Sequence, residues 1–160
     1  MRRESFEPRG VIPACLLPFT ASLEIDEPAY RRHLRDLAGV EGIAALTVNG
    51  HAAEVHALSL DEQRRVLQIT RDELDEALPI VTGVYAAGSQ EAARIARLAD
   101  QDGADALLVF PPASLALGGH LRPEMARGHF ARIADATGLP LILFQYPLSS
   151  GLGYPLGTLL

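Results

Sequence analysis

Residues 79–110, PIVTGVYAAGSQEAARIARLADQDGADALLVF, contain two short apolar runs separated by a stretch with helical spacing. The runs at 79–84 and 105–110 are rich in β-branched or aliphatic residues and have the length of buried strands. The apolar residues between them recur at the intervals of one helix face, and they are Ala92, Ile95, Ala96 and Ala99. Ser89 is a suitable cap for this helix, and Gly103 stands where the helix should stop. The stretch predicts a strand, a helix and a second strand.

The same alternation continues on both sides of this unit. Apolar runs at 11–17, 43–48 and 141–146 predict three further strands. Helical spacing is carried by Tyr30, Leu34 and Leu37, by Val66 and Ile69, and by Ala126, Phe130, Ile133 and Ala134. Asp26 with Pro28 predicts one helix start, and Ser59-Leu60-Asp61-Glu62 is a capping-box pattern. We therefore expect an α/β fold of about five strands and four helices, with parallel strands and right-handed crossovers.

Two parallel architectures fit this pattern. Near-continuous apolar strands indicate burial on both faces, which suits a barrel and a doubly wound sheet equally well. The turn after the first run is Leu17-Pro18-Phe19-Thr20 rather than a G-x-G-x-x-G motif, so a dinucleotide-binding fold is disfavoured. The chain has 160 residues, fewer than the roughly 250 of a complete eight-stranded barrel. We expect one domain or part of one.

Composition excludes several classes of protein. A net charge of -6 disfavours a nucleic-acid surface, which needs clustered positive charge. No apolar stretch reaches the length of a membrane span, and the first ten residues, MRRESFEPRG, lack the apolar segment of a secretory signal. We therefore expect a cytoplasmic chain with no membrane or nucleic-acid partner. The single cysteine, Cys15, lies in an apolar run and is expected to be a buried small side chain.

All basic residues other than histidine are arginine, and the sequence contains no lysine. A guanidinium stays protonated and cannot act as an amine nucleophile. Any mechanism that needs a neutral lysine amine is therefore outside the reach of these 160 residues alone.

Several segments carry a resemblance over nearly the whole chain, in the same order and at matching spacing. They are VIPACLLPF (11–19), TVNGHAAEVHALSLDE (47–62), GADALLVFPP (103–112) and LPLILFQYP (139–147). The chain resembles the dihydrodipicolinate synthase and N-acetylneuraminate lyase family. The resemblance implies that residues 1–160 are the N-terminal portion of a single (β/α)8 barrel domain. It also implies a Schiff-base lyase or aldolase that acts on pyruvate or another 2-keto acid without a separate cofactor.

In that family the Schiff base forms on a lysine of the sixth strand, whereas only five strands are expected here. The family's G-T-T-G-E after the second strand becomes Gly50-His51-Ala52-Ala53-Glu54. Backbone N–H groups of Ala52 and Ala53 remain able to hold a carboxylate, and His51 is either a further substrate contact or a loop histidine bonded to nearby backbone. Glu54 is expected to be structural.

The family's catalytic tyrosine position is occupied by Phe144, which has no proton to transfer. Tyr146 lies two residues on and so shares a strand face with Phe144, which makes its hydroxyl the candidate replacement. The alternative is that Tyr146 packs its ring and leaves the hydroxyl to water. Thr20 offers a hydroxyl for substrate binding after the first strand, or serves only as a turn residue.

Two other functions compete with the lyase. His51, Glu54 and His56 are ligand-type side chains in one loop and suggest a metal-assisted enzyme, although their spacing matches none of the known zinc signatures. The missing lysine suggests instead a non-catalytic truncated barrel, a pseudoenzyme or an interaction module. Five strands of a barrel would leave two open edges, so we also expect a homo-oligomer or pairing with a complementing C-terminal half.

Overall fold

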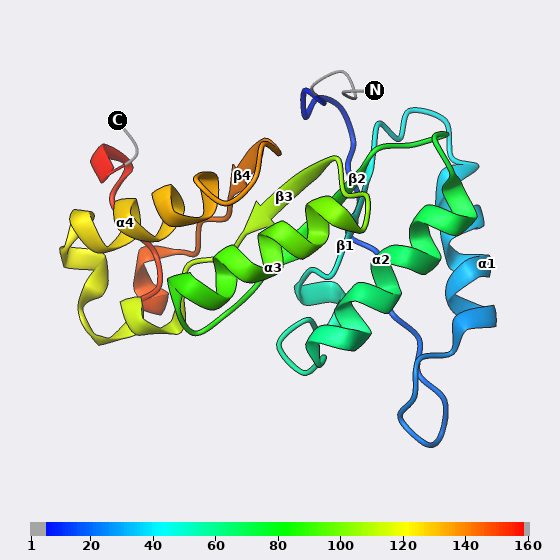
Figure 1. The fold of residues 1–160 in the computed structure, drawn as a ribbon, viewed down its shortest axis with the longest axis horizontal. Coiled ribbons are helices and arrows are strands. Elements are labelled where there is room, and N and C mark those ends of the chain that lie inside the picture. The colour runs from blue at the N-terminus through cyan, green and yellow to red at the C-terminus, as the bar shows by residue number, and fades with distance from the viewer. Residues whose placement is uncertain (1–5, 159–160) are drawn as a thin grey trace.

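The computed structural model describes residues 6–158, in which four α-helices alternate with four parallel strands (Figure 1). The strands are β1 (Leu46–Val48), β2 (Ile80–Val84), β3 (Ala106–Val109) and β4 (Leu141–Leu143). The α-helices are α1 (Glu27–Ala38), α2 (Leu60–Leu74), α3 (Ser89–Gln101) and α4 (Pro123–Ala134). The strands lie in the sheet in chain order, and every pair is parallel. The predicted α/β class and the four predicted helices are confirmed.

The first predicted strand, residues 11–17, differs from the expectation because it forms no regular strand. Ala14 makes an isolated parallel bridge with Thr47 of β1. The Cys15 N–H donates to the Thr47 carbonyl at 2.8 Å, and the Thr47 N–H donates to the Pro13 carbonyl at 2.9 Å. Because Pro13 has no N–H of its own, the ladder is interrupted. The segment thus lies where a first strand was expected, but within residues 6–158 the sheet has four regular strands rather than five.

Two of the three predicted helix starts have the expected caps. Ser59 Oγ accepts from the Glu62 N–H at 3.2 Å and the Glu62 carboxylate accepts from the Ser59 N–H at 2.7 Å, which completes the capping box of α2. Asp26 caps α1 by accepting from a first-turn N–H at 3.0 Å. The start of α3 differs, because the cap residue is Gly88 and Ser89 is already helical. The Ser89 hydroxyl bonds a histidine of α4 instead.

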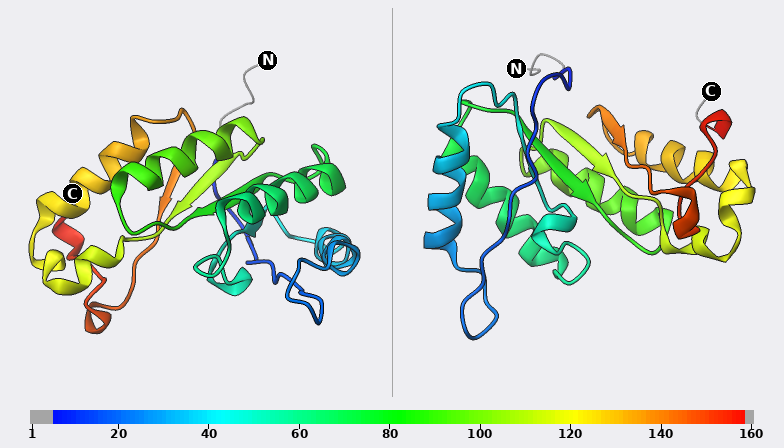
Figure 2. Two further views of the ribbon diagram at one scale, coloured as in Figure 1. Left: turned by 60° about the horizontal axis from the view of Figure 1, so that its bottom comes forward. Right: turned by 180° about the vertical axis from the view of Figure 1, so that it is seen from behind.

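The sheet divides the apolar residues into two groups. The larger core fills the space between the sheet and the helices, which all lie on one face (Figure 1). Seen from behind, no helix of the described residues covers the other face (Figure 2). That face holds a small cluster built from Ala45, Val81 and Ala106, with Phe6, Ile12, Leu108 and Ile142 packed against it. Over residues 6–158, none of the helices is both long enough and apolar enough to cross a membrane.

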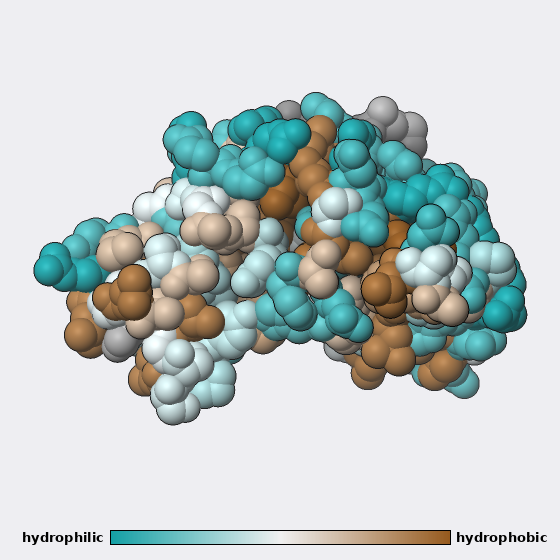
Figure 3. Space-filling view, turned by 90° about the horizontal axis from the view of Figure 1, so that it is seen from below, coloured by the Kyte–Doolittle hydropathy of each residue, from teal (hydrophilic) through white to brown (hydrophobic). Residues whose placement is uncertain are grey.

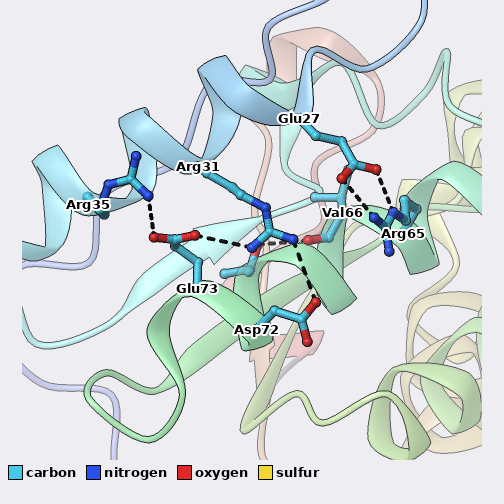
Figure 4. Close-up of polar contacts among 8 residues, drawn as sticks. Glu27, Arg31, Arg35, Arg65, Val66, Asp72 and Glu73 are labelled. Atoms are coloured by element: carbon cyan, nitrogen blue, oxygen red, sulfur yellow. Dashed lines mark hydrogen bonds and ion pairs between the residues drawn. The ribbon is translucent and has the colours of Figure 1, made fainter.

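Helices α1 and α2 are joined by ion pairs (Figure 4), in addition to the apolar side chains that both helices contribute to the larger core. Arg65 of α2 binds both carboxylate oxygens of Glu27 at 2.7 Å. Glu73 accepts from Arg35 at 2.5 Å and from Arg31 at 3.1 Å, and these guanidinium groups lower the pKa of Glu73, Arg35 more strongly. Partly exposed pairs of this kind contribute little stability individually. They connect side chains of α1 with side chains of α2.

Cys15 is buried, with 1% of its surface exposed. Burial raises the pKa of its thiol to about 12, so the side chain is neutral at pH 7. The expectation of a buried small side chain is confirmed, and Cys15 is not available as a nucleophile.

Large apolar side chains remain exposed near both ends of the sheet. Val11 and Leu16 are exposed beside β1, and Leu148 and Leu156 are exposed in the segment that follows β4. When the molecule is seen from below, apolar surface appears as patches at its left and at its right (Figure 3). Exposed apolar patches of this kind are typical of surfaces that another element or chain covers.

Candidate functional site

A group of aromatic and histidine side chains gathers at the carboxyl ends of the strands. We call this group the ring cluster, and it consists of His51, His56, Tyr85, Phe110, Phe144 and Tyr146. Tyr85, Phe110 and Phe144 are each the first residue after a strand. Parallel strands bring their carboxyl ends to the same edge of a sheet, where ligands bind in barrels and in open α/β sheets.

Phe110 forms the base of the ring cluster, with only 2% of its surface exposed. Its ring centroid lies 4.2 Å from that of His51 and 4.8 Å from that of Phe144, both tilted contacts. Tyr85 packs edge-on against Phe110, with 6.2 Å between centroids. Tyr85 and Phe110 were not singled out from the sequence. The available signal was their position at the ends of the apolar runs 79–84 and 105–110.

His51 and Tyr146 make the direct polar contact of the ring cluster, because His51 Nε2 is hydrogen-bonded to the Tyr146 hydroxyl. One histidine tautomer accepts from the hydroxyl and the other donates to it. Burial raises the pKa of Tyr146, and the nearby Tyr85 adds to this effect. Tyr146 therefore keeps its proton at pH 7 and stays neutral beside His51. The structure brings these two predicted site residues together and packs Phe144 edge-on against both rings.

Gly83 of β2 makes room for the ring cluster. A Cβ at this position would lie 1.8 Å from the Asn49 carbonyl oxygen and 3.2 Å from the Phe110 ring. Asn49 follows β1 with a φ of 52°, and its side-chain amide donates to the Gln63 carbonyl at 2.9 Å and to Thr82 Oγ1 at 3.1 Å. The loop that carries His51 therefore leaves β1 directly over the backbone of Gly83.

Tyr154 fixes the segment after β4 through hydrogen bonds to Phe144 and Gln145. The Tyr154 hydroxyl donates to the Phe144 carbonyl at 3.1 Å, and the Tyr154 N–H donates to the Gln145 side-chain oxygen at 3.2 Å. The Gln145 amide donates in return to the Tyr154 carbonyl. Tyr154 is itself buried, with 1% of its surface exposed, and packs edge-on against Phe130. These contacts fix the backbone from which Phe144 and Tyr146 project.

The pKa of His51 is expected to lie below the ordinary histidine value of about 6.5. Burial lowers it first, and the neighbouring His56 lowers it further by charge repulsion. The folded chain therefore favours neutral His51. The stability that this provides is complete above the unfolded value of about 6.5 and is lost as the pH falls from there through the lower pKa of the folded chain. An NMR titration of the His51 ring measures the shift. His56→Gln should bring the His51 pKa partly back, and titration of His51 at or above 6.5 would contradict the expectation.

The other predicted substrate-binding residues, Ala52, Ala53 and Thr20, differ in whether their hydrogen-bonding groups are already used within the chain. The Ala53 N–H already donates to the Gly50 carbonyl at 3.1 Å in a short 3-10 turn. None of the hydrogen bonds found among residues 6–158 uses the Ala52 N–H, and Ala52 is exposed. Thr20 closes its own turn, because its hydroxyl accepts from the Glu24 N–H at 3.2 Å. A cavity of about 390 Å³ is lined by Leu16, Leu17, Pro18, Ala29, His33, Ala52 and Glu54.

The three residues of the metal alternative are neighbours in the chain but do not converge. The rings of His51 and His56 lie 6.3 Å apart, centroid to centroid. In the part of the chain that the structure describes, no group of three or more His, Cys, Asp or Glu side chains is arranged to hold a metal ion. Glu54 is exposed and its backbone ends the 3-10 turn with a φ of 54°. The structural role of Glu54 stays a prediction.

The match to known proteins covers almost the whole chain. The model of the dihydrodipicolinate synthetase family matches residues 7–158. The chain belongs to this family. The 4-hydroxy-tetrahydrodipicolinate synthase of Salinibacter ruber is 35% identical over 141 residues, which are 87% of this chain and 44% of that protein. The chain thus spans about half the length of the curated relatives it matches.

Solved structures of the dihydrodipicolinate synthetase family agree in fold. The 4-hydroxy-tetrahydrodipicolinate synthase of Methylacidiphilum fumariolicum SolV superposes with a TM-score of 0.83 at 23% identity, over 96% of this chain and 49% of that one. A dihydrodipicolinic acid synthase family protein of E. coli K12, solved in complex with pyruvate, gives a TM-score of 0.76 at 26% identity, over 90% and 47% of the two chains. The barrel, rather than the doubly wound sheet, is therefore the correct architecture, and the chain covers part of it.

Proposed function

We propose that this chain is the N-terminal portion, residues 1–160, of a single-domain barrel that makes or breaks a carbon–carbon bond next to a 2-keto acid held as a Schiff base. Membership of the family and the fold support the reaction class. The observation that carries the site assignment is the hydrogen bond between His51 and Tyr146 at the carboxyl ends of the strands. Since the sequence contains no lysine, the amine comes from the rest of the barrel, and the chain alone is inactive.

The chemistry begins with the lysine amine adding to the keto carbon of pyruvate or another 2-keto acid. The keto oxygen leaves as water, and an iminium forms. Loss of a proton from the adjacent carbon gives an enamine, whose electron pair then bonds to the carbon of an aldehyde. The aldehyde oxygen takes up a proton as the new carbon–carbon bond forms. Water then adds to the product iminium, which releases the new 2-keto acid and restores the lysine amine. Cleavage follows the same steps in reverse.

Tyr146 and His51 would move protons in these steps. A neutral phenol next to a neutral imidazole is able to give a proton and recover it through the shared hydrogen bond. Phe144, at the family's tyrosine position, contributes only packing. In this proposal Tyr146 takes over the proton transfer from that position, two residues further along the chain.

The 2-keto acid carboxylate would be held next to His51. The exposed Ala52 N–H is available for it, whereas the Ala53 N–H first has to leave the Gly50 carbonyl. Thr20 would reach the substrate only if its turn opened. Ala52 and His51 are therefore the stronger candidates for the substrate contact.

Reductive trapping tests the proposal. The complete barrel, with this chain joined to the half that carries the lysine, is incubated with pyruvate and sodium borohydride and analysed by mass spectrometry. We expect a stable adduct of one pyruvate on a lysine outside these 160 residues. The 160-residue chain under the same conditions is the matched control and should gain no adduct. A complete barrel that gains no pyruvate adduct would exclude Schiff-base chemistry. This result would favour the alternative of a non-catalytic scaffold, which the missing lysine supports.

Association with a partner is part of the proposal. Exposed Val11 and Leu16 at one end of the sheet and Leu148 at the other are surfaces for a second copy or for the complementing half of the barrel. We also propose the cytoplasm as the compartment, where the free Cys15 would stay reduced.

A further inference from the structure

We propose that the aldehyde partner of the carbon–carbon step carries an aromatic ring, which packs against the ring cluster. This inference rests on the proposed function, because it names the second substrate of the same site. The chemical class is an aryl aldehyde in the direction of bond formation, or the aryl-substituted 2-keto acid in the direction of cleavage.

The first argument is the shape of the ring cluster. Phe110 closes its base, while Tyr85, Phe144 and Tyr146 are half-buried and His51 is exposed, so that parts of their rings remain open. The rings meet at tilted or edge-on angles, with interplanar values from 41° to 90° for the five contacts of His51. Offset and edge-to-face contacts are the preferred arrangements of aromatic pairs. The aromatic ring of a substrate would therefore meet these side chains at tilted or edge-on angles.

The second argument is the charge of the segments that surround the ring cluster. Segments 49–58, 85–88, 110–121 and 144–158 contain no arginine, and the chain has no lysine. Glu54 is the one acidic residue in those four segments. The arginines of residues 6–158 lie at Arg9, at Arg122 or on the four α-helices. A second substrate with its own carboxylate would thus meet no guanidinium or ammonium from this chain.

These two observations decide between classes of aldehyde. A carboxylate placed against apolar rings loses hydration without gaining a cationic partner, which is unfavourable. An aryl group gains both apolar burial and ring contacts at the same place. The site therefore selects for an aryl group and against a second acidic group.

The test compares the binding of benzaldehyde with that of succinic semialdehyde, an aliphatic aldehyde that carries a carboxylate. Saturation-transfer NMR measures the dissociation constant of each for the 160-residue chain. Because the chain has no lysine, no imine forms between the aldehydes and its side chains. Two or more ring contacts correspond to about a tenfold preference for benzaldehyde.

Two substitutions test whether the ring cluster causes the preference for benzaldehyde. Tyr85→Leu and Phe144→Leu each remove one ring of the cluster, and each should bring the two dissociation constants to within about threefold of one another. Phe6→Leu is the matched control, since Phe6 lies outside the ring cluster and packs against Ala45 and Val81 on the sheet face that no helix covers. This variant should keep the full preference. Circular dichroism of all three variants confirms that each is folded.

The outcomes separate this inference from the proposed function. Equal affinities, or tighter binding of succinic semialdehyde, would overturn the aryl specificity even if pyruvate is trapped on the complete barrel. An aryl preference that disappears in Tyr85→Leu and Phe144→Leu supports it. Trapping uses pyruvate alone, so its failure would remove the proposed reaction and leave aryl recognition by the ring cluster intact.

Discussion

Replacing Tyr146 by phenylalanine is expected to lower kcat of the complete barrel by about 10²- to 10⁴-fold, the range typical of a lost general acid–base group. The substitution removes one hydroxyl and leaves the ring contacts with His51 and Phe144 in place. KM should change little, because the hydroxyl acts on the proton transfer rather than on the ring packing. Steady-state kinetics of carbon–carbon bond formation from pyruvate and an aldehyde measure both constants.

Two further variants make this result specific. Tyr30→Phe is the matched control: the Tyr30 hydroxyl bonds Thr70 at 2.8 Å inside the α1–α2 contact, so its loss should affect stability and leave kcat unchanged. Phe144→Tyr in the Tyr146→Phe background restores a phenol at the family position and should recover part of the activity. A Tyr146→Phe enzyme within twofold of the unsubstituted one would show that another group moves the proton.

Gly83→Ala is expected to destabilise the fold by about 3 kcal/mol or more, which corresponds to roughly 10 °C in Tm. The added Cβ would overlap the Asn49 carbonyl oxygen, which is backbone and has no rotamer to change. Relief requires the β1–β2 contact to open or the Asn49 corner to move. Either change would displace His51 from Phe110, so the His51–Tyr146 contact should be lost with the stability. Thermal unfolding and the NMR signals of the His51 ring report the two effects.

Gly128→Ala is the control for this substitution. Gly128 lies in α4, is exposed, and has no atom within 4 Å of the position of an added Cβ. Alanine at an exposed helix position should raise stability by about 0.5–1 kcal/mol. The two glycine substitutions therefore have opposite expected signs. Equal effects would mean that backbone entropy, rather than the overlap at Asn49, decides the outcome at Gly83.

The α/β fold was predictable because its signals are local. Each apolar run is followed by a segment of helical spacing, and the caps at Asp26 and at Ser59 with Glu62 mark two helix starts by residues within one turn. The first strand was overestimated, since Pro13 interrupts a ladder that the apolar run 11–17 alone predicts. Ser89 was misassigned because its partner, His129, comes from another helix.

The candidate site was predictable only in part, because its contacts join residues far apart in the chain. Strand alternation over 141–146 predicted that Tyr146 shares the face of Phe144, but β4 ends at Leu143, so both residues lie beyond the regular strand. The contact of Tyr146 with His51 depends instead on the path of the loop after β1. That path is set by the φ of Asn49 and by the absence of a side chain at Gly83, neither of which leaves a periodic signal. Tyr85 and Phe110 were missed because each was counted only as the end of an apolar run.

The order of the strands in the sheet bears on how the chain forms during synthesis. Every strand pairs with its predecessor in the sequence, so no strand has to wait for a distant segment before it docks. Such nearest-neighbour pairing shortens the loops that must close during folding. We therefore expect each strand to dock on the edge of the strand before it as the chain leaves the ribosome, in the order β1 to β4.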